Sequence, residues 1–137
     1  MGAKYKKMET KKYTVLVIED EEMLLNAIVK KLELSGLSSI PSKSGAEALK
    51  ILKEANDLPN AIWLDYYLND MDGIEFMNAL RQNDKWSSIP TIVVSNSAND
   101  DRVKNMLAFG VKKYYLKANS RLDDIIAYIK EFLVKGG

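Results

Sequence analysis

Short apolar runs rich in β-branched residues alternate along this chain with segments whose apolar residues recur at helical spacing. The runs lie at about 13–18, 37–40, 61–65, 90–95 and 112–116. Regular alternation of strands and helices indicates βαβ units and a parallel sheet. A run without internal polar residues, such as 15–18, is typical of a strand that helices cover on both faces. The sequence therefore predicts a doubly wound α/β sandwich with five strands and five helices.

The helical segments carry their own start and stop signals. Ser44 and Glu47 have the spacing of a capping box, Ser120 is the expected cap of the last helix, and Gly36 and Gly110 follow helix ends. Apolar residues three or four positions apart give the helices apolar faces. They are Leu25, Ile28 and Leu32; Ile74, Met77 and Leu80; Val103, Met106 and Leu107; and Leu122, Ile125, Ile129 and Phe132.

The composition excludes several classes of protein. The chain of 137 residues fits one domain, and it contains neither Cys nor His, which excludes disulfides, Ser-His-Asp catalysis and Cys- or His-ligated metals. A net charge of +1 gives no reason to expect a nucleic acid or a membrane as partner, and no apolar stretch is long enough for a transmembrane helix. We expect a cytoplasmic domain at 13–134, a flexible basic leader at 1–12 and a short tail at 135–137.

Polar residues follow four of the five runs. Glu19 and Asp20 follow the first, Asp65 ends the third, Ser95 ends the fourth, and Lys117 follows the fifth. Because the carboxyl ends of parallel strands meet at one edge of a sheet, these side chains are expected to lie together there. Two negative charges about 4 Å apart repel by roughly 4 kcal/mol at an effective dielectric near 20. The three carboxylates therefore predict a site for a divalent cation.

These residues and their neighbours resemble the response-regulator receiver domain of two-component signalling. The resemblance covers about residues 13–134, in the order and at the spacing of the family. It implies a flavodoxin-like (βα)5 fold with strand order 2-1-3-4-5, which makes strands 1, 3, 4 and 5 neighbours. The matching blocks are Val-Ile-Glu-Asp-Glu at 17–21, Leu64-Asp65 with Met71-Asp72-Gly73, Val94-Ser95, and Tyr115-Leu116-Lys117.

The resemblance implies that Asp65 is a phosphoacceptor. It would attack the phosphohistidine of a sensor histidine kinase or a histidine phosphotransfer protein and form an acyl phosphate. Ser95 and Lys117 would bind the phosphoryl oxygens, by a hydrogen bond and as a point charge. Such a domain assists its own phosphorylation and dephosphorylation and is not otherwise an enzyme.

The resemblance also implies a bound Mg²⁺ ion. Its ligands would be Asp20 and Asp65, the backbone carbonyl of Tyr67, and Glu19 acting through a water molecule, because Mg²⁺ prefers oxygen ligands and keeps several waters. The acids at 20–22 would in any case favour a helix start there.

Output in this family passes through a switch formed by the strand-end hydroxyl residue and an aromatic residue, here Ser95 and Tyr114. The implied signalling face comprises the fourth helix, the fifth strand and the fifth helix, and it would bind a downstream protein or a second copy of the chain. The alternative is a receiver-like domain that has lost phosphorylation and acts as a protein-interaction module.

The chain departs from the family pattern near the expected site. Ala118 stands where the family usually has a proline joined by a cis peptide bond, so either a strained bond or a different loop path is expected. Asn69 also replaces a frequent proline, and Asn96 replaces a small residue. Tyr67 and Asn96 would flank the acyl phosphate, and the ring of Tyr67 is expected to obstruct hydrolytic water.

Two other classes share parts of this pattern. A flavodoxin needs hydrogen-bond donors after the first strand, where this chain has Glu19 and Asp20. A haloacid-dehalogenase-type phosphatase needs a second Asp two residues after its nucleophile, and Tyr67 occupies that position. An EF-hand at 68–79 is excluded by Leu68 and Ala79 at ligand positions. The receiver interpretation therefore fits the residues best.

Overall fold

The computed structural model describes residues 12–136, so nearly all of the expected leader and the last residue of the expected tail lie outside the described residues. Within that range, five strands form one parallel sheet in the order β2-β1-β3-β4-β5. This confirms the predicted flavodoxin-like α/β fold. The strands are β1 (Thr14–Ile18), β2 (Ser38–Ser42), β3 (Ala61–Asp65), β4 (Thr91–Ser95) and β5 (Lys113–Leu116).

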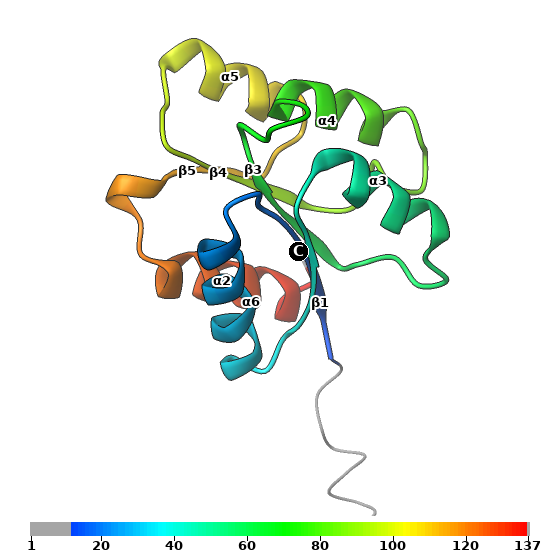
Figure 1. Ribbon diagram of the computed structural model, residues 1–137, viewed down its shortest axis with the longest axis vertical. Helices are drawn as coiled ribbons and strands as arrows, with labels where there is room; N and C mark the ends of the chain where they lie inside the picture. Colours follow the sequence, from blue (N-terminus) through cyan, green and yellow to red (C-terminus); the bar gives the residue numbers. More distant parts are fainter. Residues whose placement is uncertain (1–11, 137) are drawn as a thin grey trace, which may run out of the picture.

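Helices cover both faces of the sheet, with α3, α4 and α5 on one side and α2 and α6 on the other (Figure 1). Alternate residues of each strand enter the two apolar layers: Leu16 and Leu64 pack under α3 and α4, whereas Val17 and Trp63 pack under α2 and α6. Burial on both faces explains why the runs lack polar residues. The helices are α2 (Glu22–Leu34), α3 (Gly45–Glu54), α4 (Gly73–Arg81), α5 (Asp100–Ala108) and α6 (Leu122–Val134).

The predicted helix signals agree with the structure at α2 and α3. Gly36 has a φ of 86°, and the amide of Leu37 donates to the carbonyl of Leu32 at 3.0 Å, so α2 ends there. Leu37 therefore closes the helix, and β2 begins at Ser38, one residue later than expected. At α3, the Ser44 side chain accepts a hydrogen bond from the amide of Glu47, as predicted, whereas the Glu47 carboxylate accepts from the amide of Lys43 at 2.7 Å and not from that of Ser44, which a capping box requires.

The prediction that Ser120 caps the last helix is wrong. Residues Lys117–Asn119 form a 3-10 turn, η1, and Ser120 ends that turn, its amide donating to the carbonyl of Lys117. Arg121 then occupies the N-cap position of α6, so the helix begins one residue later than a Ser120 cap would place it. Asp123 and Asp124 supply negative charge to its first turn.

The backbone after β5 takes a path without a cis bond. Among the described residues all peptide bonds are trans, including the one between Lys117 and Ala118, and the chain turns through η1 instead. Of the two expected outcomes at Ala118, the structure has the different loop path. None of the helices between residues 12 and 136 has the length and apolar content that a membrane crossing needs.

Candidate functional site

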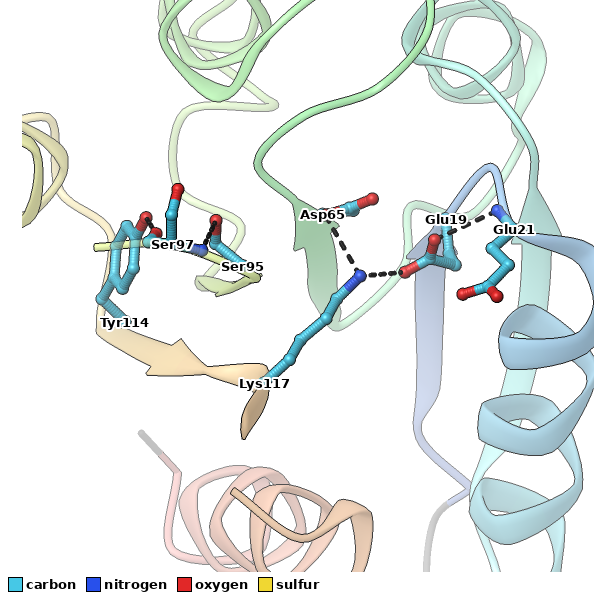
Figure 2. Close-up of polar contacts among 7 residues, drawn as sticks. All are labelled: Glu19, Glu21, Asp65, Ser95, Ser97, Tyr114 and Lys117. Carbon is cyan, nitrogen blue, oxygen red and sulfur yellow. Dashed lines mark hydrogen bonds and ion pairs between the residues drawn. The ribbon is translucent and has the colours of Figure 1, made fainter. Parts of the chain in front are cut away.

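The ends of four neighbouring strands bring the predicted polar residues to one edge of the sheet (Figure 2). Glu19 follows β1, Asp65 ends β3, Ser95 ends β4, and Lys117 follows β5. The parallel register aligns these ends because Asp65 lies opposite Val94, the residue before Ser95. Sequence and topology together therefore place acidic, hydroxyl and ammonium groups at the carboxyl edge.

The Lys117 ammonium lies between two buried carboxylates, as Figure 2 shows. Its Nζ is 3.2 Å from Oε1 of Glu19 and 3.5 Å from Oδ1 of Asp65. Glu19 is 1% exposed and Asp65 is 5% exposed. The other oxygen of Glu19 accepts a hydrogen bond from the amide of Glu21 at 3.1 Å. Both oxygens of Glu19 therefore have protein partners, which a buried charge requires.

Three carboxylates gather beside this ammonium. One oxygen from each of Glu19, Asp20 and Asp65 lies within 4.8 Å of the others. Burial, followed by the charge of Glu19, raises the pKa of Asp65 to about 7, even though Lys117 acts to lower it. The ammonium therefore compensates only part of the negative charge, and a set of oxygen donors with excess negative charge fits a hard divalent cation.

The pKa of Lys117 is raised as well. Burial acts to lower it, but the charges of Asp65 and Glu19 outweigh that effect. Lys117 therefore stays a cation near neutral pH.

Ser95 is fully buried at the end of β4, and its Oγ accepts a hydrogen bond from the amide of Ser97 at 3.3 Å. A hydroxyl that accepts one hydrogen bond still carries a hydrogen to donate. Tyr114 on β5 reaches the same loop, because its hydroxyl donates to the carbonyl of Ser97 at 2.8 Å (Figure 2). Ser95 and Tyr114 are therefore linked through one residue, Ser97.

Tyr67 lies in the loop after β3 and is 51% exposed. Its hydroxyl accepts a hydrogen bond from Nη2 of Arg102 in α5. The role of its backbone carbonyl as a metal ligand stays a prediction.

Sequence reasoning did not identify Ser97, Arg102 or Asp70. Asp70 accepts hydrogen bonds from the amides of Gly45 and Ala46 at the start of α3, at 3.0 and 2.8 Å. These contacts join loops that are distant in sequence, and no local pattern signals them.

Comparisons with known proteins agree with this geometry. Residues 15–130 match the response regulator receiver domain family. The chain is 35% identical over 124 residues to the transcriptional regulatory protein PrrA of Mycobacterium tuberculosis, covering 90% of this chain and 51% of PrrA. It thus spans about half the length of that relative. It is 31% identical over 109 residues to the sensor histidine kinase CheAY of Helicobacter pylori, covering 79% of this chain and 13% of that protein.

A solved structure supports the fold. The CheY-like response regulator receiver domain protein from Methanospirillum hungatei JF-1 superposes with a TM-score of 0.79 at 23% identity. The match covers 91% of this chain and 96% of that one.

Proposed function

The chain belongs to the response regulator receiver domain family, and we propose that it is the phosphoacceptor of a two-component phosphorelay, with Asp65 as the residue phosphorylated. The observation that carries the proposal is the buried Asp65 carboxylate, grouped with two other acids and 3.5 Å from Lys117 Nζ. Local structure does not require this acid. Asp72 caps α4, and Asp70 binds the start of α3, so neither helix depends on Asp65.

In the proposed reaction, a carboxylate oxygen of Asp65 attacks the phosphorus of a phosphohistidine. The new O–P bond forms as the P–N bond breaks, and the electron pair leaves with the imidazole nitrogen of the partner. Lys117 would neutralise charge on the phosphoryl oxygens, and the hydroxyl of Ser95 would donate a hydrogen bond to one of them. Phosphoryl transfer depends mainly on such positioning and charge compensation.

We propose that Asp20 and Asp65 bind Mg²⁺ directly, with the backbone carbonyl of Tyr67, and that Glu19 acts through water. The partners of Glu19 support this division, because its two oxygens already bind Lys117 Nζ and the amide of Glu21. When bound, the cation would compensate the carboxylate charge and polarise the phosphoryl group.

The test is incubation with Mg²⁺ and acetyl phosphate, followed by intact mass measurement. Wild type is expected to gain one phosphoryl group, and Asp65→Asn none. Asp72→Asn is the matched control, since it also removes a carboxylate from this loop while Asn can still cap α4. A wild-type protein that stays unmodified would favour the protein-interaction module instead.

A sensor histidine kinase or a histidine phosphotransfer protein is the proposed donor, and similarity to a segment of a histidine kinase supports this class of partner. The proposed output face comprises α5, β5 and α6, and it would bind a downstream protein or a second copy of the chain. The contact of Tyr114 with the loop of Ser95 supports a switch there. We propose a cytoplasmic signalling domain that is not otherwise an enzyme.

A further inference from the structure

One guanidinium group joins the loops that follow β3 and β4. Arg102 lies in the first turn of α5, where Nη1 donates to Oγ of Ser97 at 2.9 Å and Nη2 donates to the hydroxyl of Tyr67. Its Cζ also lies 4.7 Å from the ring centre of Tyr66 and 5.0 Å from that of Tyr67. Nη1 also donates to the carbonyl of Ser97 at 3.5 Å, so Arg102 combines these three hydrogen bonds with two cation–π contacts.

The two tyrosine rings that lie against the Arg102 guanidinium differ in how closely they are packed. Tyr66 is buried, and a Cβ added to Gly73 would lie 2.7 Å from its ring. The rings of Tyr66 and Tyr67 meet edge to face with their centres 4.8 Å apart. Tyr66 is thus held by the core, whereas the half-exposed ring of Tyr67 contacts Tyr66 and Arg102.

Arg102 contacts neighbours of the proposed reacting groups. Tyr66 and Tyr67 directly follow Asp65 in the chain. Ser97 donates its amide hydrogen to Oγ of Ser95. The guanidinium thus spans the two loops that follow Asp65 and Ser95, through Tyr66, Tyr67 and Ser97, and it also interacts with Tyr114 of β5.

We infer that Arg102 is a positioning residue that holds the ring of Tyr67 against the loop of Ser97 and thereby prolongs the life of the phosphorylated form. The inference rests on the proposed phosphorylation of Asp65. Hydrolysis of an acyl phosphate needs water in line with the breaking bond, so a fixed Tyr67 ring, two residues after the phosphorylated Asp65, would restrict that approach. Without the guanidinium, the Tyr67 side chain gains rotamer freedom and exposes the path for part of the time.

The first test measures the decay of phosphorylated protein in Mg²⁺ by intact mass. Arg102→Ala is expected to decay about 2- to 5-fold faster than wild type, the factor that corresponds to loss of one exposed cation–π contact. Arg102→Lys keeps the charge but loses the planar fork, so it should also decay faster. Arg81→Ala is the matched control, because Arg81 stacks on Phe109 at 5.3 Å and should leave the decay unchanged.

A double-variant cycle separates positioning from a general loss of structure. If Arg102 acts through Tyr67, the variant Arg102→Ala with Tyr67→Ala decays no faster than Tyr67→Ala alone. Melting temperatures of all variants are measured in parallel, and Arg102→Lys serves for the comparison if Arg102→Ala is unstable. The inference would be overturned if Arg102→Ala or Arg102→Lys lost its phosphoryl group at the wild-type rate, or if the two substitutions had additive effects on that rate in the double variant.

The second test does not require phosphorylation. NMR of the metal-free protein should show guanidinium signals of Arg102 in slow exchange, and Tyr67→Phe should shift or broaden them by removing the hydroxyl acceptor. Unchanged Arg102 signals in Tyr67→Phe would contradict the hydrogen bond between Arg102 and the Tyr67 hydroxyl. A wild type that takes no phosphoryl group but shows the expected shift would reject the proposed function while leaving the contact between Arg102 and Tyr67 in place.

Discussion

The pKa of Asp65 makes the stability of the fold depend on pH. In the folded protein this pKa is raised from 3.8 to about 7, chiefly by burial and then by the charge of Glu19. The folded state therefore binds a proton that the unfolded state has released. The contribution of Asp65 to the free energy of unfolding is complete below its ordinary pKa and is lost as the pH rises through about 7.

Replacement of Asp65 by Asn should remove this pH dependence. In metal-free buffer, Asp65→Asn is expected to melt several degrees above wild type at about pH 8, and the difference should shrink toward about pH 4. The rise in the pKa of Asp65 from 3.8 to about 7 corresponds to a change in the free energy of unfolding of at most about 4 kcal/mol. Thermal melts across the pH range measure the effect. A variant that melts below wild type at the higher pH would mean that the pairing of Lys117 with Asp65 outweighs the repulsion between the acids.

The metal site gives a prediction for Asp20 and Glu19. Asp20→Ala should reduce Mg²⁺ affinity by more than about tenfold, because it removes both a ligand and negative charge. Glu19→Ala should have a smaller effect, since its oxygens already bind Lys117 and the amide of Glu21. Titration calorimetry with Mg²⁺ measures both.

The control for this titration is Glu22→Ala, which removes an exposed acid that pairs with Lys43 at 3.4 Å. The Mg²⁺ affinity of Glu22→Ala should stay close to that of wild type. Equal affinities in wild type and Asp20→Ala would reject the site.

Residues at strand ends were predictable because a parallel sheet fixes where those ends lie. The strand pattern and the order of strands were enough to predict that Asp65, Ser95 and Lys117 lie at one edge of the sheet. The direct contact of Lys117 with Glu19 was not foreseen, since it depends on side-chain reach between residues 98 positions apart. The position of Arg102 was equally hidden, because its partner Tyr67 is 35 residues away.

At the scale of elements, α3 depends on a residue from another loop. Ser44 caps the N-terminus of α3, and the Asp70 carboxylate also accepts hydrogen bonds from the amides of Gly45 and Ala46 in its first turn. Burial acts to raise the pKa of Asp70, but hydrogen bonds from the amides of Ala46 and Gly45 and from its own amide outweigh it, and the pKa lies below its ordinary value. The loop after β3 is thus joined to α3 at one end and to α5 through Tyr67.

Loss of the Asp70 carboxylate should weaken this connection. Asp70→Ala is expected to lower the free energy of unfolding by about 1 kcal/mol near neutral pH, the usual cost of removing a helix N-terminal acceptor. Because the folded pKa is depressed, this stability is present above the ordinary pKa and is lost as the pH falls below it. Denaturant unfolding at about pH 7 and about pH 3 checks both effects.

The matched control is Asp57→Ala, which removes an exposed acid from the loop before β3. It should leave the unfolding free energy nearly unchanged at both pH values. An Asp70→Ala variant as stable as this control would show that Ser44 suffices to cap α3.

The element boundaries show which signals in a sequence are reliable. Ser44 capped its helix as expected, because the amide that its side chain accepts from, that of Glu47, lies only three residues later. Ser120 did not, because the preceding turn is set by how the chain leaves β5, and a single Ser contains no information about that path. Patterns complete within one turn were therefore predictable, and isolated residues were not.

At the scale of the whole molecule, one sheet separates two apolar layers. The layer under α2 and α6 and the layer under α3, α4 and α5 share the same strands, since alternate residues of β1, β3 and β4 enter each. Loss of either layer would expose one face of every central strand. The two layers should therefore unfold together.

The two tryptophans can test this, because they report on opposite layers. Trp63 is buried in the layer under α2 and α6, and Trp86 packs against the other layer. In Trp86→Phe the fluorescence follows Trp63, and in Trp63→Phe it follows Trp86. For each variant, the fluorescence midpoint in denaturant should coincide with the far-UV circular dichroism midpoint of the same variant, so a change in overall stability does not affect the comparison. Fluorescence that changes at lower denaturant than the dichroism in either variant would mean that one layer opens while the sheet persists.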